Sequence, residues 1–199
     1  MSELIIDPLP PAAASSPALV AQLTDLVNEV YAAAETGLWR ENSPRTDRPE
    51  IAALIRAGEI ALARLGTEVV GGVRIQRLDA CTGELGMLVA DPGHRSRGIG
   101  RALVEHAERR CAAAGCSTMQ LELLMPLTWS HPTKDFLAAW YHRIGYRVVR
   151  RASIDEIAPG LAHRLATGCD FAIFHKPLPD RGNLSSEEQR SDGVEPLVE

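Results

Sequence analysis

The sequence predicts a single α+β domain built on a mixed sheet. Three observations support this class. Short segments in which apolar and polar residues alternate are typical of half-buried strands. Between them, apolar residues recur at spacings of three and four, which indicates amphipathic helices. The chain has 199 residues, 45% hydrophobic and 24% charged, which is enough for one full core and short for two.

The N-terminal part predicts one strand followed by two helices. Residues 4–9 have the β-like pattern. Ser16 followed by Pro17 is typical of a helix N-cap with proline at the first helical position. The apolar spacing then continues to about Thr36, and a second, shorter helix is expected over residues 49–57.

The middle of the chain predicts three strands and then a helix. Gly66 and Thr67 form a two-residue hairpin signal between the first two strands. Gly115 is placed to end the helix with a left-handed cap. The expected ranges are 59–65, 68–77 and 84–90 for the strands, and 100–114 for the helix.

The C-terminal part predicts a strand, a helix and two more strands. The helix starts at Thr133 or Lys134 and ends before Gly145. A connector with its own helical segment joins the last two strands. The expected strands cover residues 118–124, 146–151 and 170–176.

Most of the formal net charge of −5 lies at the end of the chain, where residues 177–199 hold six acidic residues against Arg181 and Arg190. We therefore expect a folded domain over residues 1–176 and a disordered, acidic tail over residues 177–199. The nearly neutral domain lacks the basic face of a nucleic-acid-binding protein.

The four cysteines show neither a Cys-x-x-Cys spacing nor a histidine at metal-ligand distance from a pair. This favours reduced thiols, no metal site and a cytoplasmic location. No apolar run is long enough for a membrane span, and the N-terminus does not resemble a signal peptide, so no membrane partner is expected.

Residues 88–104, Leu-Val-Ala-Asp-Pro-Gly-His-Arg-Ser-Arg-Gly-Ile-Gly-Arg-Ala-Leu-Val, carry the strongest functional signal. A strand ends there, and a basic loop containing Gly98 and Gly100 opens directly into a helix. Glycines allow a ligand to approach the backbone closely, and the first N–H groups of a helix have no partner within it. Such a helix start binds anions, which predicts a pyrophosphate site.

The loop lacks the Walker pattern and the third glycine of the dinucleotide fingerprint. Its Arg-x-x-Gly-x-Gly pattern, formed by Arg95, Gly98 and Gly100, resembles the coenzyme A loop of the GNAT superfamily of N-acetyltransferases. The alternative is an ordinary strand-to-helix loop with surface arginines. The element order supports the resemblance over residues 3–176, and implies a mostly antiparallel seven-stranded sheet flanked by about four helices.

The resemblance also implies acetyl-CoA as co-substrate, no metal, and the possibility of a homodimer. The main chain at the end of the fourth strand would stabilise the oxyanion. Lys134 stands where the family commonly has Asn, which leaves two alternatives: the lysine contacts a phosphate instead, or the helix starts at a different position. The expected cofactor-binding residues are Leu88, Val89, Ala90, Arg95, Ser96, Arg97, Gly98, Ile99, Gly100, Arg101, Lys134 and Tyr141.

Trp140-Tyr141-His142-Arg143-Ile144-Gly145-Tyr146 resembles the family's Leu-Tyr-x-x-x-Gly-Phe segment, which makes Tyr141 the candidate general acid. The alternative role for this tyrosine is core packing. The general base stays open between Glu84, Glu122 and His131, acting directly or through water.

By the same resemblance, the acceptor site is formed by residues 37–49 and 152–169. Its substrate-binding candidates are Trp39, Arg40 and Glu41. Acidic residues there, Asp155 and Glu156, would attract an ammonium group, whereas Arg40, Arg45 and Arg48 would suit a carboxylated acceptor. The sequence leaves this choice open.

The expected activity is acetyl-CoA-dependent transfer of an acetyl group to a primary amine of a small molecule or peptide, directly in a ternary complex. The alternative is a non-catalytic acyl-CoA-binding module that acts as a sensor or scaffold.

Overall fold

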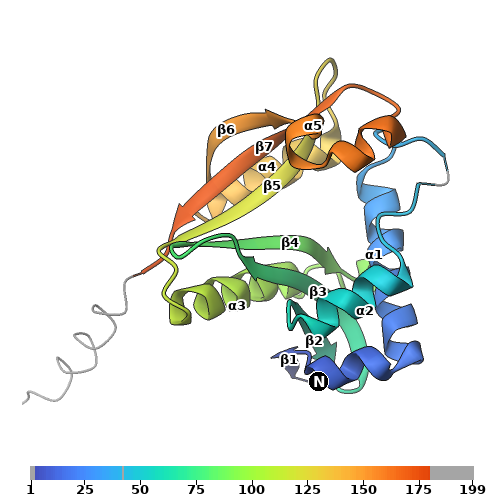
Figure 1. The fold of residues 1–199 in the computed structure, drawn as a ribbon, viewed down its shortest axis with the longest axis vertical. Helices are drawn as coiled ribbons and strands as arrows, with labels where there is room; N and C mark the ends of the chain where they lie inside the picture. Colours follow the sequence, from blue (N-terminus) through green and yellow to red (C-terminus); the bar gives the residue numbers. More distant parts are fainter. Residues whose placement is uncertain (1–2, 42, 180–199) are drawn as a thin grey trace, which may run out of the picture.

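The computed structural model describes residues 3–41 and 43–179. Its centre is one seven-stranded sheet with the strand order β1-β2-β3-β4-β5-β7-β6 (Figure 1). Neighbouring strands are antiparallel except β4 and β5, which are parallel. The expected mixed, mostly antiparallel sheet is therefore confirmed.

All expected strands and helices occur, with ends that differ by a few residues from the expected ranges. The strands are β1 (Leu4–Pro8), β2 (Ile60–Leu65), β3 (Glu68–Arg77), β4 (Thr82–Ala90), β5 (Thr118–Pro126), β6 (Arg147–Ser153) and β7 (Cys169–Pro177). The helices are α1 (Pro17–Ala34), α2 (Arg48–Arg56), α3 (Ile99–Ala113), α4 (Pro132–Arg143) and the short α5 (Ile154–Ile157), with 3₁₀ turns η1 (Pro11–Ser15), η2 (Pro92–His94) and η3 (Pro159–Arg164).

The helix starts follow the capping signals in the sequence. The Ser16 hydroxyl accepts a hydrogen bond from the Leu19 N–H and caps α1. The Asp47 carboxylate accepts one from the Glu50 N–H at 2.8 Å and caps α2. Gly98 precedes α3 with φ +72°, a left-handed conformation that favours glycine.

Helices lie on both faces of the sheet (Figure 1), and an apolar core cluster fills the space between the sheet and the helices on each face. Leu103 and Val104 of α3, with Tyr141 of α4, pack in one core cluster. Leu23 of α1 and Ile55 of α2 pack in the other. Burial of these apolar faces is what holds the helices on the sheet.

The last described residues extend the folded part past the expected boundary at residue 176. β7 continues to Pro177, and the Leu178 side chain is 7% exposed and joins the core cluster under α3. The Leu178 N–H donates to the Ser117 carbonyl at 2.8 Å. The rest of the predicted tail, residues 180–199, lies outside the described residues. Among the described helices, none is both long enough and apolar enough to cross a membrane.

Candidate active site

The parallel pair β4 and β5 separates soon after it begins. The two strands pair only from Thr82 with Thr118 to Glu84 with Gln120. Beyond that point β4 continues to Ala90 beside β3, and β5 continues beside β7. Figure 1 shows the two halves of the sheet opening away from each other. The edge of β4 that faces β5 is therefore unpaired by β5 beyond Glu84.

A β-bulge in β4 lies at this opening. Gly72 pairs with Val89 and Arg74 pairs with Gly86, so two residues, Met87 and Leu88, lie opposite one residue of β3. Met87 has φ +46°, which is uncommon for a residue other than glycine.

The bulge changes which face of the sheet the β4 side chains reach. Before it, Leu85 packs in the core cluster with α3. After it, Met87 and Val89 pack in the cluster with α1, and Leu88 packs against the α3 side. The bulge thus reverses which side chains of β4 face each side of the sheet, at the point where β4 and β5 separate.

A cleft of about 1130 Å³ occupies the space between the separated strands. It reaches from Leu88 and Ala90 to the loop before α3, and from there to Glu122 and Tyr141. Eleven of the expected cofactor-binding residues line it: Leu88, Ala90, Arg95, Ser96, Arg97, Gly98, Ile99, Gly100, Arg101, Lys134 and Tyr141. Val89 does not, because its side chain is buried in the core and its backbone pairs with Gly72.

The loop before α3 offers positive charge without internal partners. Arg95 and Arg97 are exposed, and neither is ion-paired to a described carboxylate. Arg101 pairs with Glu105 at 2.8 Å across one turn of the exposed helix surface. His94 lies between two carboxylates, 3.5 Å from Glu68 and 3.3 Å from Asp91.

The glycine at position 100 leaves open space above the start of α3. A Cβ built on Gly100 would meet no heavy atom within 4 Å, and Gly100 does not have a positive φ. The fold itself therefore does not need glycine there. Glycine is instead useful for a ligand that approaches the helix N-terminus closely, because it leaves room beside the backbone.

Two candidate bases lie together on the floor of the cleft. Glu84 and Glu122 both line it, and both are half-buried. Burial, together with the nearby Glu84 carboxylate, raises the pKa of Glu122 to about 7. Glu84 accepts a hydrogen bond from the Gln76 amide. A carboxyl group with a pKa near neutrality suits proton transfer at physiological pH.

His131, the third candidate base, does not line the cleft. Its side chain is 5% exposed, and its Nε2 lies 3.1 Å from the Thr36 carbonyl, which can only accept a hydrogen bond. Since the Nε2 proton is used there, the ring holds the N-terminus of α4 against the end of α1. Because this side chain lies outside the lining of the cleft, the structure does not support the expectation that His131 acts as a base.

Tyr141 lies at the wall of the cleft near the end of α4. Its ring contacts Trp140, Tyr146 and Phe174, at centroid distances of 4.9, 5.8 and 6.0 Å. Burial raises the pKa of the Tyr141 hydroxyl well above its usual value, so the hydroxyl keeps its proton at neutral pH. No described residue hydrogen-bonds to this hydroxyl. It packs in the core and also presents a donor to the cleft.

Lys134 has a different partner from the one expected. Its Nζ lies 2.5 Å from Glu35 Oε1, and the two side chains are 4% and 6% exposed. Glu35 also accepts a hydrogen bond from the Trp39 indole N–H. The expected phosphate contact of Lys134 is therefore not supported, because its charge is already directed at a buried carboxylate.

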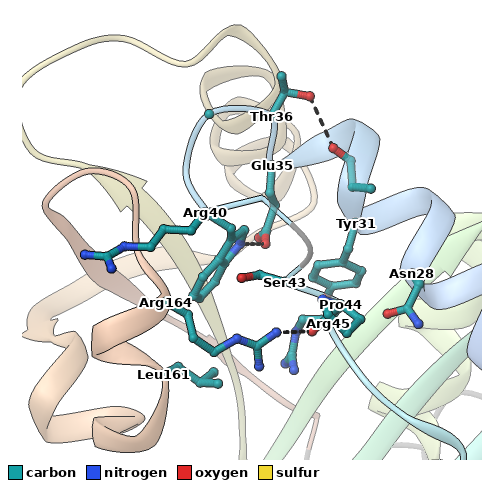
Figure 2. Close-up of a pocket in the computed structure, with 13 residues that line it drawn as sticks. Asn28, Tyr31, Glu35, Thr36, Arg40, Ser43, Pro44, Arg45, Leu161 and Arg164 are labelled. Atoms are coloured by element: carbon teal, nitrogen blue, oxygen red, sulfur yellow. Dashed lines mark hydrogen bonds between the residues drawn. The ribbon is translucent and has the colours of Figure 1, made fainter.

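A smaller cavity of about 540 Å³ adjoins the cleft (Figure 2). The two share five lining residues: Tyr31, Glu35, Trp39, Arg45 and Leu161. Of the predicted acceptor residues, Trp39, Arg40 and Arg45 line the smaller cavity. Glu41 is exposed and lines neither, and Arg48 is also exposed and lies outside both.

The sequence reading missed several residues of this region. Tyr31 lies on α1, and Glu35 follows one turn later, directly after the helix. In the sequence, both residues look like ordinary helix positions and carry no functional signal. Arg164, in η3, reaches the other wall of the smaller cavity. The sequence indicated this side of the cavity in one way: residues 152–169, which include Arg164, were expected to form part of the acceptor site.

The profile of the acetyltransferase (GNAT) family matches residues 23–146. The chain belongs to the GNAT acetyltransferase family. The matched segment contains the Arg-x-x-Gly-x-Gly loop and ends at Tyr146, so it includes both motifs on which the resemblance was based. No curated protein sequence matches the chain.

Solved structures of other GNAT-like proteins share its fold. The Salmonella typhimurium yncA structure with acetyl-CoA has a TM-score of 0.63 at 15% identity, over 90% of this chain and 96% of that chain. An aminoglycoside 6'-N-acetyltransferase with coenzyme A has a TM-score of 0.65 at 19% identity, over 89% and 98%. The PaiA N-acetyltransferase of Thermoplasma acidophilum with coenzyme A has a TM-score of 0.64 at 15% identity, over 88% and 99%.

Proposed function

We propose that this GNAT protein is an N-acetyltransferase that moves an acetyl group from acetyl-CoA to a primary amine of a small molecule or peptide, directly in a ternary complex. One observation carries the proposal. The cleft between β4 and β5 joins an anion-binding helix start to a carboxyl group with a pKa near 7 and a protonated tyrosine. The solved relatives that hold acetyl-CoA or coenzyme A support the choice of co-substrate.

The loop before α3 would bind the pyrophosphate. The free N–H groups of the first turn and the positive end of the helix favour an anion there. Arg95 and Arg97 can add charge-assisted hydrogen bonds, since no described carboxylate neutralises them. Gly100 leaves the room that close approach requires.

The end of β4 would orient the acyl arm and its carbonyl. Past Glu84 the strand has an edge that β5 does not pair. The backbone N–H of Leu88 or Ala90, which line the cleft, would donate to the oxyanion as it forms, and such fixed donors act without reorganisation. The bulge at Met87 and Leu88 is what turns this part of the strand.

Glu122 is the general base of the proposal, directly or through a water molecule. An alkylamine has a pKa of about 10, so a proton must leave before the nitrogen can attack. With a pKa of about 7, Glu122 is partly ionised at neutral pH and strong enough to accept this proton. Glu84, whose charge helps to raise that pKa, supports this role from the adjacent strand.

Tyr141 is the donor to the leaving sulfur. Its hydroxyl is protonated across the neutral range and has no competing hydrogen bond among the described residues. A positioned proton donor contributes about 10²–10⁴ in rate. Holding amine and thioester together would supply much of the rest.

Release of free thiol from acetyl-CoA in the presence of a panel of primary amines tests the proposal. We expect thiol and N-acetylated product to form in equal amounts and only when both substrates are present. Tight coenzyme A binding with no thiol release from any amine would instead support the sensor or scaffold function. Absence of coenzyme A binding would contradict both.

A further inference from the structure

We infer that the acceptor is an amine that also carries an anionic oxyacid group, a carboxylate or a phosphate, which Arg45 and Arg164 bind in the smaller cavity. This inference rests on the proposed function and specifies its substrate class. It concerns the cavity that opens into the cleft, which neither the coenzyme A loop nor the candidate acid and base occupy.

The smaller cavity holds positive charge that the protein does not neutralise. Arg45 and Arg164 are both half-buried, and neither is ion-paired to a described carboxylate. Within residues 3–41 and 43–179, Glu35 is the only carboxylate that lines this cavity, and Lys134 already pairs with it. Half-buried arginines without a counter-ion favour binding of an external anion.

The two arginines come from opposite walls and are held in place. The Arg164 Nη2 donates to the Pro44 carbonyl, next to Arg45, and links η3 to the loop before α2 (Figure 2). The Arg45 guanidinium lies over the Tyr31 ring, 5.3 Å from its centroid. This cation–π contact holds the Arg45 guanidinium near the ring, and a planar guanidinium matches the two oxygens of a carboxylate or phosphate.

Arg40 makes a different contribution. Its Nε donates to the Leu165 carbonyl at 3.2 Å, and its side chain extends away from Tyr31, Arg45 and Arg164 (Figure 2). It therefore joins the loop after α1 to the connector before β7. The anion site therefore consists of Arg45 and Arg164, whereas Arg40 has a structural role in the wall of the cavity.

The geometry also gives the acceptor a direction. Tyr31, Arg45 and Leu161 line both cavities, so a molecule bound by its anionic end in the smaller one extends into the cleft. Its amine then lies in the cleft that Glu122 also lines. A second amine at the far end would meet Arg45 and Arg164 and be repelled, so simple diamines are disfavoured acceptors.

Three probes of one length test this inference: 5-aminopentanoate, 5-aminopentanamide and 1,5-diaminopentane, with acetyl-CoA and the full chain. They carry an anionic, a neutral and a cationic far end. The same series at shorter and longer chain lengths covers an unknown distance to the thioester, and an aminoalkyl phosphate series separates phosphate from carboxylate. We expect kcat/KM for the anionic probe to exceed that for its amide about 10–100-fold at the best length.

Arg45→Gln and Arg164→Gln should each remove most of this preference, because kcat/KM falls much more for the anionic probe than for its amide. Arg48→Gln, which changes the same charge on an exposed residue outside both cavities, is the matched control. Arg45→Lys should restore part of the preference, because charge returns without the planar fork. Thermal midpoints within about 3 °C of the control would exclude a folding defect as the cause.

Equal rates for acid and amide, a preference for the diamine, or a preference unchanged in both arginine variants would overturn the inference and leave the proposed function standing. Calorimetry with coenzyme A-loaded protein and 5-aminopentanoate separates the two failures. Carboxylate binding that is lost in Arg45→Gln, without any thiol release, supports the anion site and contradicts the proposed function. Neither binding nor turnover with any probe would overturn both.

Discussion

Lys134 on α4 and Glu35 just after α1 form an ion pair in the interior, with Nζ and Oε1 2.5 Å apart and both side chains at most 6% exposed. They are separated by 99 positions in the sequence. Glu35 also accepts from the indole N–H of Trp39, so the pair connects the loop of the acceptor cavity to the helix that carries Tyr141. This contact ties together the two walls between which both substrates would lie.

The pair should be important for stability because removing one charge leaves the other buried. We expect Lys134→Met to lower the free energy of unfolding by about 3–5 kcal/mol, measured by denaturant titration. The double variant Glu35→Gln with Lys134→Met should recover much of that loss, because no buried charge then remains. If Lys134 instead held a phosphate, the single variant would weaken coenzyme A binding and leave the denaturant midpoint unchanged.

The fold and the cofactor loop were accessible from the sequence because their signals are local. Helix periodicity, the cap at Ser16 and the glycines of residues 98–100 each lie within a few positions. That the strands form one mostly antiparallel seven-stranded sheet followed only through the family resemblance. Local sequence patterns predict whether a segment is a helix or a strand, whereas the arrangement of these elements in space was predicted from the family resemblance.

Where the structure departs from the expected candidate site, long-range contacts are the common cause. A phosphate contact is one of two alternatives that the sequence leaves for Lys134, because its partner Glu35 is far away in the sequence. His131 was a candidate base because the Thr36 carbonyl that uses its Nε2 belongs to a distant loop. Arg164 joins the acceptor cavity through a bond to the Pro44 carbonyl, which no sequence spacing indicates.

Gly100→Val should abolish measurable coenzyme A binding without unfolding the protein. A Cβ at this position meets nothing within 4 Å in the fold, so the added methyl groups would fill only the space over the helix start. Calorimetry with coenzyme A should show an affinity loss of at least about 100-fold, with a smaller loss for Gly100→Ala. An unchanged affinity with an unchanged thermal midpoint would contradict a pyrophosphate site at this loop.

Tyr141→Phe should lower kcat about 10²-fold or more and change coenzyme A affinity less than about twofold. The phenyl ring keeps the contacts with Trp140, Tyr146 and Phe174, and only the hydroxyl is lost. Steady-state kinetics and calorimetry on the same variant measure the two quantities. If turnover is untouched, the tyrosine serves packing alone.

Glu122→Gln should remove the pH dependence of kcat near neutrality. The base acts when it is ionised, so kcat of the wild-type protein rises as pH increases through about 7, where Glu122 loses its proton. In Glu84→Gln this rise should move to lower pH, because the nearby negative charge that raises the Glu122 pKa is gone. A pH profile that is the same in all three proteins would exclude Glu122 as the base.

The same carboxyl group should make the folded state less stable as pH rises. Its pKa is about 7 when folded against an ordinary value of 4.5, so between these values the folded state binds more protons than the unfolded chain. The contribution of Glu122 to the free energy of unfolding is therefore constant below about pH 4.5. It falls as the pH increases to about 7 and is constant again at higher pH. Glu122→Gln removes this loss, so the variant should gain stability relative to wild type between pH 5 and about 8, measured by denaturant midpoints in the same buffers. If the stability difference between Glu122→Gln and wild type does not vary over this pH range, the pKa of Glu122 is not raised in the folded state. That result would also contradict the assignment of Glu122 as a base that works near neutral pH.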